Sequence, residues 1–333
     1  MQRFDIITGG TARDILESNR EKVLDIVRNT YLHHSAGEAV NPDSHFLRFP
    51  GNSDSRIIAL PAHLGANVRF AGLKWIASFP ENTKSGIPRA SAVLILNDYE
   101  TGYPVACIEA ATISSARTAA SAALAARALR PGGYGGTRIA VVGAGVIARN
   151  IANYLHTAGC TPDSYVVHDL DEFSGNALAD HIDQTQGVPV DFTADRAAAL
   201  EAETIVFATT ALQPYVAKPF EAGQLVLNIS LRDLEPRVIL AAQNILDDVG
   251  HCLKASTSPH LAEQASGSRD FVTGTLADVL NNLVTLDPGR PVVFSPFGLG
   301  VLDLAVGVFI LHEAHESESS LRIPDFFGET ERW

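Results

Sequence analysis

The glycines at positions 143 and 145 stand in a pattern that suits the binding of a dinucleotide. Residues 137–159 read TRIAVVGAGVIARNIANYLHTAG, with G-x-G-x-x-A at Gly143, Ala144, Gly145, Val146, Ile147 and Ala148. An apolar run precedes the motif and a helical pattern follows it, which is the context that the motif requires. Gly143 permits a tight turn, Gly145 lets a pyrophosphate approach the backbone, and Ala148 allows close packing of helix on strand. The N terminus of the helix then attracts the phosphates.

An acidic residue ends the next apolar run and bears on the choice of cofactor. Asp169 stands 24 positions after Gly145. A carboxylate at this place accepts hydrogen bonds from the adenosine ribose and repels a 2′-phosphate. Leu170, Asp171 and Glu172 supply no cation for such a phosphate. The sequence therefore predicts NAD rather than NADP.

Three cations and one carboxylate are candidates for substrate chemistry. Arg117 lies at the start of an Ala-rich segment, where a cation opposes the helix dipole unless an anion is near. A surface salt bridge and a carboxylate clamp both fit it. Lys74 and Arg56 adjoin apolar runs and, taken alone, are expected to face outward from strands. Asp233 follows the fifth apolar run of the second half, so it is either a general base at a ligand-binding sheet edge or a solvated loop aspartate.

A second glycine-rich segment, Gly298-Leu299-Gly300, comes shortly before Asp303. We expect Asp303 to be an N-terminal helix residue, where a carboxylate is favourable. Gly300 leaves room for a nucleotide contact. No spacing of His, Cys, Asp or Glu suggests a metal site.

The elements that must position these residues change character near position 137. Before it, a helix is expected over residues 12–31 and strands over 56–60, 68–76, 91–97 and 105–110, which predicts an antiparallel or mixed sheet packed on a helix. Residues 117–129 are expected to form an Ala-rich helix, whose start Ser114 or Ser115 could cap.

From position 137 on, short apolar runs alternate with helical stretches. The runs are 139–142, 165–168, 188–192, 204–208, 225–229 and 244–246. Continuous apolar runs are typical of parallel strands that are buried on both faces, and six of them make a complete dinucleotide-binding sheet. A last helix is expected over residues 302–315.

Composition limits the class of protein. The 333 residues are 46% hydrophobic and 19% charged, which suits a large core and two domains. The net charge of −13 disfavours nucleic acid or an anionic membrane as a partner. The three cysteines form no C-x-x-C pair, and no signal sequence or membrane span is seen, so a cytoplasmic enzyme with a small-molecule partner is expected.

Several of these segments, taken in order, resemble the ornithine cyclodeaminase/mu-crystallin family. They are GLKW (72–75), SSARTAA (114–120), VGAG (142–145), the N-x-x-x-x-D that ends at Asp233, and the G-x-x-x-D region at 299–303. A narrower similarity, to the family's dehydrogenases of 2,3-diaminopropionate biosynthesis, lies in RIIALPAHLG (56–65), GLKWIASFPEN (72–82), RASAVLILND (89–98) and IEAATISSARTAA (108–120).

This resemblance implies an α/β fold in which a Rossmann NAD-binding domain (121–303) is inserted into a discontinuous α+β substrate and dimerisation domain (1–120 plus 304–333). It implies a homodimer. Arg56, Lys74 and Arg117 would hold the substrate, Lys74 would also be catalytic, and Asp233 would be the acid/base. Cofactor contacts would come from Arg117, Thr118, Thr209, Thr210, Asn228, Ser230 and Gly300 in addition to the glycine loop and Asp169.

The implied reaction is the NAD-dependent oxidative hydrolysis of N-((2S)-2-amino-2-carboxyethyl)-L-glutamate to 2,3-diaminopropionate and 2-oxoglutarate. One segment departs from the family pattern. Cyclodeaminases of the family carry a Gly-Gly-Asp loop, whereas this chain has Leu231-Arg232-Asp233. Ornithine or lysine cyclodeamination, ketimine reduction and alanine dehydrogenation stay open as alternatives, as does a nucleotide- and ligand-binding role without catalysis.

Overall fold

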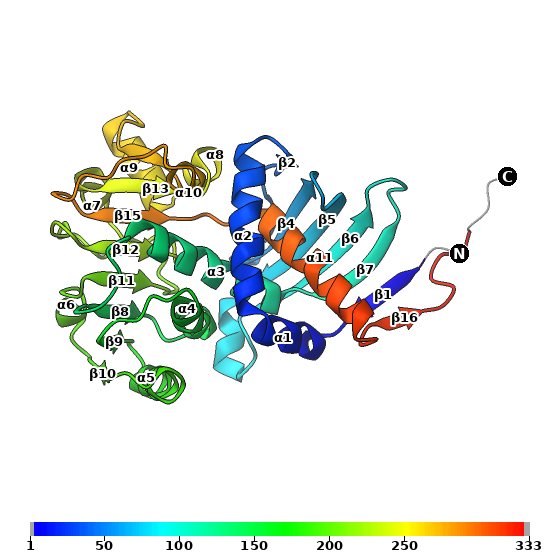
Figure 1. Ribbon diagram of the computed structural model, residues 1–333, viewed down its shortest axis with the longest axis horizontal. Helices are drawn as coiled ribbons and strands as arrows, with labels where there is room; N and C mark the ends of the chain where they lie inside the picture. Colours follow the sequence, from blue (N-terminus) through cyan, green and yellow to red (C-terminus); the bar gives the residue numbers. More distant parts are fainter. Residues whose placement is uncertain (1–2, 330–333) are drawn as a thin grey trace. The chain divides into compact units, whose positions relative to one another are not determined.

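The computed structural model describes residues 3–329 and divides the chain into two compact units (Figure 1). Unit 1 combines the chain up to Arg117 with the chain from Leu299 on, and unit 2 is Thr118–Gly298. The divisions thus fall a few residues before the expected boundaries at 120 and 303, and Asp303 belongs to unit 1. Residues 1, 2 and 330–333, the ends of the expected first domain, lie outside the described residues.

Unit 1 contains an eight-stranded mixed sheet in the order β16-β1-β7-β6-β5-β4-β2, with β3 paired to β4. Strands β1 and β7 are parallel and the other pairs are antiparallel. The strands are β1 (Phe4–Ile7), β2 (Ala39–Val40), β3 (His45–Phe49), β4 (Asn52–Leu64), β5 (Phe70–Ser78), β6 (Ala90–Asp98), β7 (Pro104–Glu109) and β16 (Leu321–Ile323); a 3₁₀ turn, Pro80–Ser85, separates β5 from β6. The mixed sheet agrees with the pattern of short strands in the sequence.

The two faces of this sheet differ in burial. Along β5 and β6, Lys74 and Leu94 are buried, whereas Trp75 and Val93 are 39% and 38% exposed. Successive strand residues point to opposite faces, and Lys74 pairs with Leu94 as Trp75 pairs with Val93. The buried face packs against helix α11 (Gly300–Glu316), which also contacts α2 (Arg20–Ser35) (Figure 1).

Helix α11 is buried from Gly300 to Leu311 and, apart from Asp303, is apolar on all sides over this stretch. It lies very close to the sheet at Gly307, where an added Cβ would be 2.2 Å from Cδ2 of Leu94. A side chain at position 307 would therefore require the Leu94 side chain to move. The expected helix over residues 302–315 is therefore confirmed, with its start two residues earlier.

The expected single helix over residues 12–31 is wrong, because the chain forms two helices, α1 (Gly9–Ser18) and α2. Asn19 separates them with a non-helical backbone (φ −129°), and its side-chain Nδ2 donates to the carbonyl of Ile15 at 2.8 Å. Asparagine competes with the helix for backbone groups in this way and favours helix ends.

The Ala-rich helix α3 (Ala111–Leu129) begins six residues before the expected start. The carboxylate of Glu109 accepts hydrogen bonds from the backbone N–H groups of Ala111 and Thr112 at 2.7 and 3.2 Å, so it caps the helix. The expected cap at Ser114 or Ser115 is wrong, since both serines lie within the helix. Arg117 consequently lies in the second turn, where its side chain is buried.

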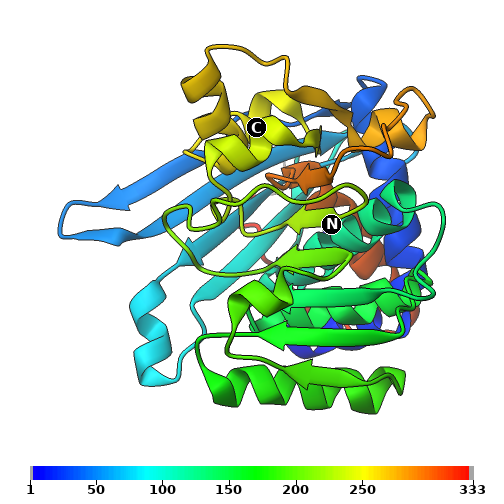
Figure 2. The same cartoon turned by 90° about the vertical axis from the view of Figure 1, so that its left-hand side faces the viewer.

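Unit 2 contains an eight-stranded parallel sheet in the order β10-β9-β8-β11-β12-β15-β13-β14 (Figure 2). The strands are β8 (Arg138–Val142), β9 (Ser164–His168), β10 (Val190–Phe192), β11 (Thr204–Phe207), β12 (Leu225–Asn228), β13 (Gln243–Leu246), β14 (Val272–Thr275) and β15 (Val292–Ser295). All six expected strands are present. Two further strands, β14 and β15, were not expected from the sequence. Strand β15 pairs with both β12 and β13 and therefore lies between them, and β14 pairs with the other side of β13.

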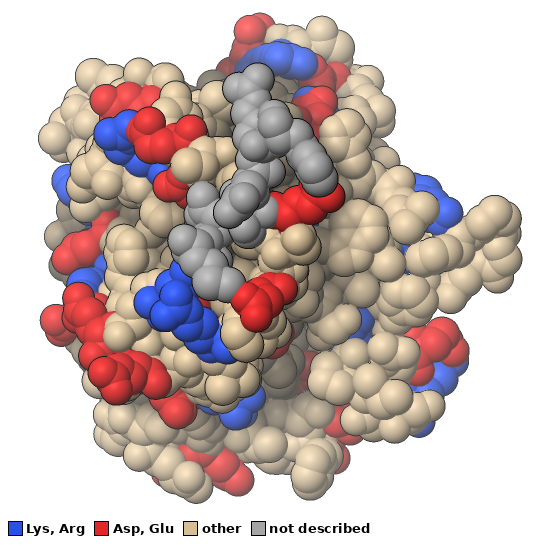
Figure 3. Space-filling model, turned by 90° about the vertical axis from the view of Figure 1, so that its right-hand side faces the viewer, with Lys and Arg blue, Asp and Glu red and all other residues tan. Residues whose placement is uncertain are grey.

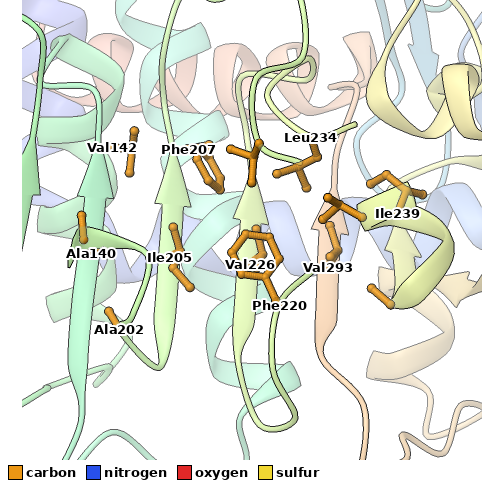
Figure 4. Packing of buried hydrophobic residues seen from close by; sticks show 14 of the residues in the cluster. Ala140, Val142, Ala202, Ile205, Phe207, Phe220, Val226, Leu234, Ile239 and Val293 are labelled. Carbon is orange, nitrogen blue, oxygen red and sulfur yellow. The ribbon is translucent and has the colours of Figure 1, made fainter. Parts of the chain in front are cut away.

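The helices of unit 2 are α4 (Val146–Thr157), α5 (Glu172–Gln186), α6 (Arg196–Ala199), α7 (Pro236–Ala241), α8 (Val249–Cys252), α9 (Ser258–Ser266) and α10 (Leu276–Leu280). Figure 4 shows one core of this unit, to which four neighbouring strands contribute Val142, Phe207, Val226 and Val293 and α7 contributes Ile239. Burial on both sides explains why the strands read as continuous apolar runs.

Charged side chains of both signs are interspersed on the face of the molecule shown in Figure 3. This face therefore carries no broad basic field of the kind that binds nucleic acid. Over residues 3–329, no helix has the length and apolar character needed to cross a membrane.

Candidate active-site residues

Strand β5 places Lys74 on the helix-covered face of its sheet, so the expectation of an outward-facing lysine is wrong. The residue is 2% exposed. Its Nζ donates to Oδ2 of Asp303 at 2.6 Å and to Oγ of Ser114 at 3.3 Å. The reason lies in the register of β5, in which Trp75 takes the open face and Lys74 the buried one.

The charge of Lys74 responds to three opposing influences. The pKa of its ammonium group falls from 10.5 to about 8 as the net result: burial lowers this pKa most, Asp303 raises it and Arg117 lowers it further. Lys74 is therefore mostly protonated at neutral pH but loses its proton at a far lower pH than an exposed lysine. Such perturbed groups are candidates for chemistry.

Arg117 shares the counter-ion of Lys74. Its Nε donates to Oδ1 of Asp303 at 3.3 Å, and its Nη2 lies 3.5 Å from Oγ of Ser114. Because Arg117 is 9% exposed and Asp303 is fully buried, the surface salt bridge considered from the sequence is wrong. We call Lys74, Arg117, Asp303 and Ser114 the cationic cluster, since two cations share one carboxylate within it.

Asp303 is the functional candidate that sequence reasoning missed. It does lie in the first turn of α11, as expected, yet its side chain forms ion pairs with two cations. One signal could have identified it, since Asp303 is the single charged residue between Gly300 and His312 in an otherwise apolar helix. A charge in such surroundings requires a partner.

Arg56, predicted to bind substrate, and Gly300, predicted to contact the cofactor, also belong to unit 1 but are not members of the cationic cluster. Arg56 on β4 pairs with Ser78, four residues along β5 from Lys74, or about 13 Å at strand spacing. It is half-buried and on the same face as Lys74. Gly300 is buried at the start of α11, with Leu60 of β4 within van der Waals distance of a hypothetical Cβ. Thr118 is half-buried and begins the part of α3 that belongs to unit 2.

The glycine loop of unit 2 has the backbone that its sequence predicts. Gly143 has a φ of +97°, and an added Cβ would be 2.5 Å from the carbonyl oxygen of Ala208. Gly145 is the N-cap residue of α4, which has no side-chain cap, and open space surrounds the position of its missing Cβ. Val146 is 61% exposed, whereas Ala148 is buried against the sheet. An uncapped helix N terminus that a ligand can approach fits the pyrophosphate of a dinucleotide.

Asp169 is held against this loop. Its Oδ2 accepts a hydrogen bond from the backbone N–H of Ala144 at 2.6 Å, and its Oδ1 accepts one from the backbone N–H of Asp171 at 2.8 Å. The neighbouring side chains of Leu170 and Phe173 are 96% and 83% exposed. A carboxylate beside exposed apolar groups, next to the glycine loop, fits the ribose and adenine of NAD. The hollow lined by Ala144, Gly145, Val146, Arg149, Phe173, Ser174, Ala177, Leu178 and His181 has a volume of about 370 Å³.

Asp233 lies beyond the carboxyl end of β12, as expected, but it is fully buried rather than solvated. Its Oδ1 accepts hydrogen bonds from the hydroxyls of Thr209 and Tyr215 at 2.6 and 2.8 Å, and its Oδ2 accepts one from Ser230 at 2.5 Å. Burial and, next, Asp233 raise the pKa of the Tyr215 hydroxyl, so Tyr215 remains a donor. Three hydroxyls, two from the connection between β11 and β12 and one from the segment after β12, thus fix one carboxylate.

The remaining predicted cofactor residues of unit 2 lie at the same edge of the sheet. Thr210 is exposed, and Ile147 lies in the first turn of α4. Asn228 is buried, its Nδ2 donates to Oγ of Ser295 at 3.1 Å, and its Oδ1 has no hydrogen-bond partner among residues 3–329. In the described part of the chain, no group of three or more His, Cys, Asp or Glu is suited to a metal ion.

Comparisons with known proteins identify the family. The sequence model of the ornithine cyclodeaminase/mu-crystallin family matches residues 14–318. The N-((2S)-2-amino-2-carboxyethyl)-L-glutamate dehydrogenase of Staphylococcus aureus is 31% identical, over 88% of this chain and 90% of its own length. An NAD(P)H-dependent anabolic L-arginine dehydrogenase of Pseudomonas aeruginosa is 28% identical, over 86% and 90%.

The fold has solved counterparts. The Δ¹-pyrroline-2-carboxylate reductase of Thermococcus litoralis, in complex with NADH and L-proline, superposes with a TM-score of 0.87 at 20% identity, over 96% of this chain and 100% of its own. The predicted α/β fold is thereby confirmed. With a dehydrogenase as a 31% identical relative, and with the glycine loop and Asp169 in place, the chain is an NAD-dependent oxidoreductase, as expected. It belongs to the ornithine cyclodeaminase/mu-crystallin family.

Proposed function

We propose that this enzyme oxidises N-((2S)-2-amino-2-carboxyethyl)-L-glutamate with NAD and hydrolyses the product to 2,3-diaminopropionate and 2-oxoglutarate. The observation that carries the proposal is the cationic cluster, in which Lys74 and Arg117 share the single carboxylate of Asp303. A buried excess of positive charge is costly until an anion neutralises it. The substrate of the Staphylococcus aureus relative carries three carboxylates, which suits such a cluster.

The donors of the cluster are only partly used. A lysine has three N–H donors and an arginine has five. Asp303 and Ser114 each accept one from Lys74 and one from Arg117. The remaining donors can bind a substrate carboxylate, and a guanidinium does so with two parallel hydrogen bonds. Arg56, on the same face of the sheet, would bind a more distant carboxylate of the same molecule.

NAD, held by the glycine loop and Asp169, would supply the acceptor for a hydride from the α-carbon of the glutamate moiety, and loss of that hydride would leave a C=N bond in the substrate. Addition of water to this bond and its cleavage give a keto acid and a primary amine. We assign the activation of that water to Asp233. A carboxylate has about four lone-pair sites, of which three hydroxyls occupy three in this structure, so one is left to accept a proton from water.

The test is incubation of the purified protein with NAD and N-((2S)-2-amino-2-carboxyethyl)-L-glutamate, followed by NADH absorbance and mass spectrometry of the products. We expect NADH, 2-oxoglutarate and 2,3-diaminopropionate in equal amounts. Asp233→Asn keeps the shape of the side chain and should abolish turnover while NADH still binds. Asp270→Asn, at an exposed aspartate of the same unit, is the matched control and should be fully active. Normal turnover in Asp233→Asn would remove Asp233 from the mechanism.

The competing activities give different products. Cyclodeamination of ornithine or lysine would release ammonia without net formation of NADH. Ketimine reduction would consume NADH with a cyclic imine as substrate. Alanine dehydrogenation would form NADH, but from alanine and with pyruvate and ammonia as the other products. A protein that only binds nucleotide and ligand would show NADH binding and no turnover with any of these substrates.

We also propose that the chain forms a homodimer through the open face of the unit 1 sheet. This face presents Trp75 and Val93, both more than a third exposed, from neighbouring strands. Exposed apolar surface of this kind marks interaction sites. A solved alanine dehydrogenase with a similar fold is described as a dimer with bound NAD. Light scattering should give twice the chain mass of 35.5 kDa, and Trp75→Glu should give the chain mass.

A further inference from the structure

Asp303 is placed to do more than neutralise buried charge. Each of its oxygens accepts from a different cation, Oδ2 from Lys74 and Oδ1 from Arg117. The carboxylate itself is fully buried in the first turn of α11, where the helix dipole also favours a negative charge. One rigid helix thus fixes two side chains that come from β5 and from α3.

We propose that Asp303 is a positioning residue, which aligns Lys74 with Arg117 as one carboxylate-binding pair and keeps Lys74 charged for substrate binding. The proposal deepens the proposed function, because the bound carboxylate belongs to the amino-acid substrate. Ser114 completes the arrangement, since its hydroxyl oxygen lies 3.3 Å from Nζ of Lys74 and 3.5 Å from Nη2 of Arg117. Both cations are thereby held on two common acceptors.

The charged groups around Lys74 are few. Asp303 faces it from α11 and Arg117 from α3. On β6 the residue opposite Lys74 is Leu94, and on β4 it is Leu60, so the neighbouring strands present apolar side chains there. Arg56 on β4 lies about 13 Å along the strand. Burial and Arg117 therefore both favour the neutral form of Lys74, and Asp303 alone of these favours the charged form.

This balance predicts opposite effects for two substitutions. Asp303→Asn removes the attractive charge and keeps the shape, so Lys74 should lose its proton at a pH lower by about 1 to 3 units. Arg117→Gln removes the repulsive charge, so Lys74 should keep its proton to a higher pH. The pH at which kcat/KM falls on the alkaline side should move with the titration of Lys74 in both variants.

The chain offers a direct assay that does not depend on turnover. It contains five lysines, at positions 22, 74, 84, 218 and 254. Protein labelled with ¹³C at the lysine ε-carbon gives one resonance for each, and Lys74→Arg assigns the resonance of Lys74. Titration of this resonance in the wild-type chain, in Asp303→Asn and in Arg117→Gln measures the proposed influence of each neighbour.

We expect a wild-type midpoint near pH 8, which falls in Asp303→Asn and rises in Arg117→Gln. An unchanged midpoint in folded Asp303→Asn would overturn the proposal. If that variant does not fold, a wild-type midpoint near the ordinary value for lysine, or a lower midpoint in Arg117→Gln, overturns it instead. A shifted midpoint with an unmoved kcat/KM profile refutes the role in substrate binding. Failure of the wild-type enzyme to oxidise the substrate contradicts only the proposed function, because the titration is independent of it.

Discussion

The buried ammonium group of Lys74 should make the stability of the fold depend on pH in a way that one substitution removes. The pKa of this group is about 8 in the folded chain, against an ordinary value of 10.5. Below pH 8 the lysine is charged in both states, and the folded state bears the cost of burying that charge. Between pH 8 and 10.5 the unfolded chain binds the additional proton, so stability rises with pH over this window.

The magnitude follows from the two pKa values. One pKa unit corresponds to about 1.4 kcal/mol, so the charged form of Lys74 costs the folded chain about 3 kcal/mol. From about pH 7.5 to about pH 10, most of this cost is relieved, and the free energy of unfolding should rise by about 2 kcal/mol through Lys74 alone. Lys74→Met fills a similar volume without a charge and should lack this rise.

Urea unfolding at a series of pH values measures the effect as the difference between the wild-type chain and Lys74→Met. The difference cancels the contributions of the other groups that titrate in this range. Lys218 is 86% exposed, so Lys218→Met is the matched control and should follow the wild-type curve. Parallel curves for the wild-type chain and Lys74→Met would refute the reasoning, since they would mean that burial does not perturb Lys74.

Three further substitutions test the unit 2 half of the account. Gly143→Ala places a Cβ 2.5 Å from the carbonyl oxygen of Ala208, at a φ of +97°. The affinity for NADH, measured by fluorescence titration, should therefore fall at least about tenfold, which is a loss of about 1.4 kcal/mol. An unchanged affinity would contradict the assigned role of the loop. Asp169→Ser removes the carboxylate that opposes a 2′-phosphate, so the ratio of kcat/KM for NAD to that for NADP should fall, and a constant ratio would exclude Asp169 from the choice of cofactor. Leu231 has a left-handed backbone (φ +77°), which is strained for a residue with a side chain. Leu231→Gly relieves this strain and loses the contacts of the side chain, so the free energy of unfolding should change by less than about 1 kcal/mol. A loss of several kcal/mol in urea unfolding would show that no strain is stored there.

The parallel sheet could be predicted from sequence because its signal is local. Strands such as β8 and β11 are buried on both faces and are therefore written as unbroken apolar runs. Strand β14 escaped prediction because it reads Val-Thr-Gly-Thr and is only partly buried. Strand β15 is as short, apolar and buried as β11, so its absence from the prediction has no such local reason. Its position beside β12 depends on long-range pairing.

In the candidate site, too, the residues with a local sequence signal could be predicted and those that depend on long-range packing could not. The glycine loop and Asp169 were predictable, because strand, turn and helix follow one another directly in the chain. The burial of Lys74 was not, since a residue's face in a sheet depends on what packs against it. Its partner Asp303 is 229 residues away, and the hydroxyls of Thr209, Tyr215 and Ser230 come together around Asp233 only in the folded unit.

The central claim is that this enzyme removes a hydride from a carbon that bears nitrogen. The most direct measurement uses N-((2S)-2-amino-2-carboxyethyl)-L-glutamate that carries deuterium at the α-carbon of its glutamate moiety, together with NAD and the purified protein. Mass spectrometry of the nucleotide should find NADH that contains one deuterium atom, formed in equal amount with unlabelled 2-oxoglutarate. NADH without deuterium, or products without NADH, would contradict the account.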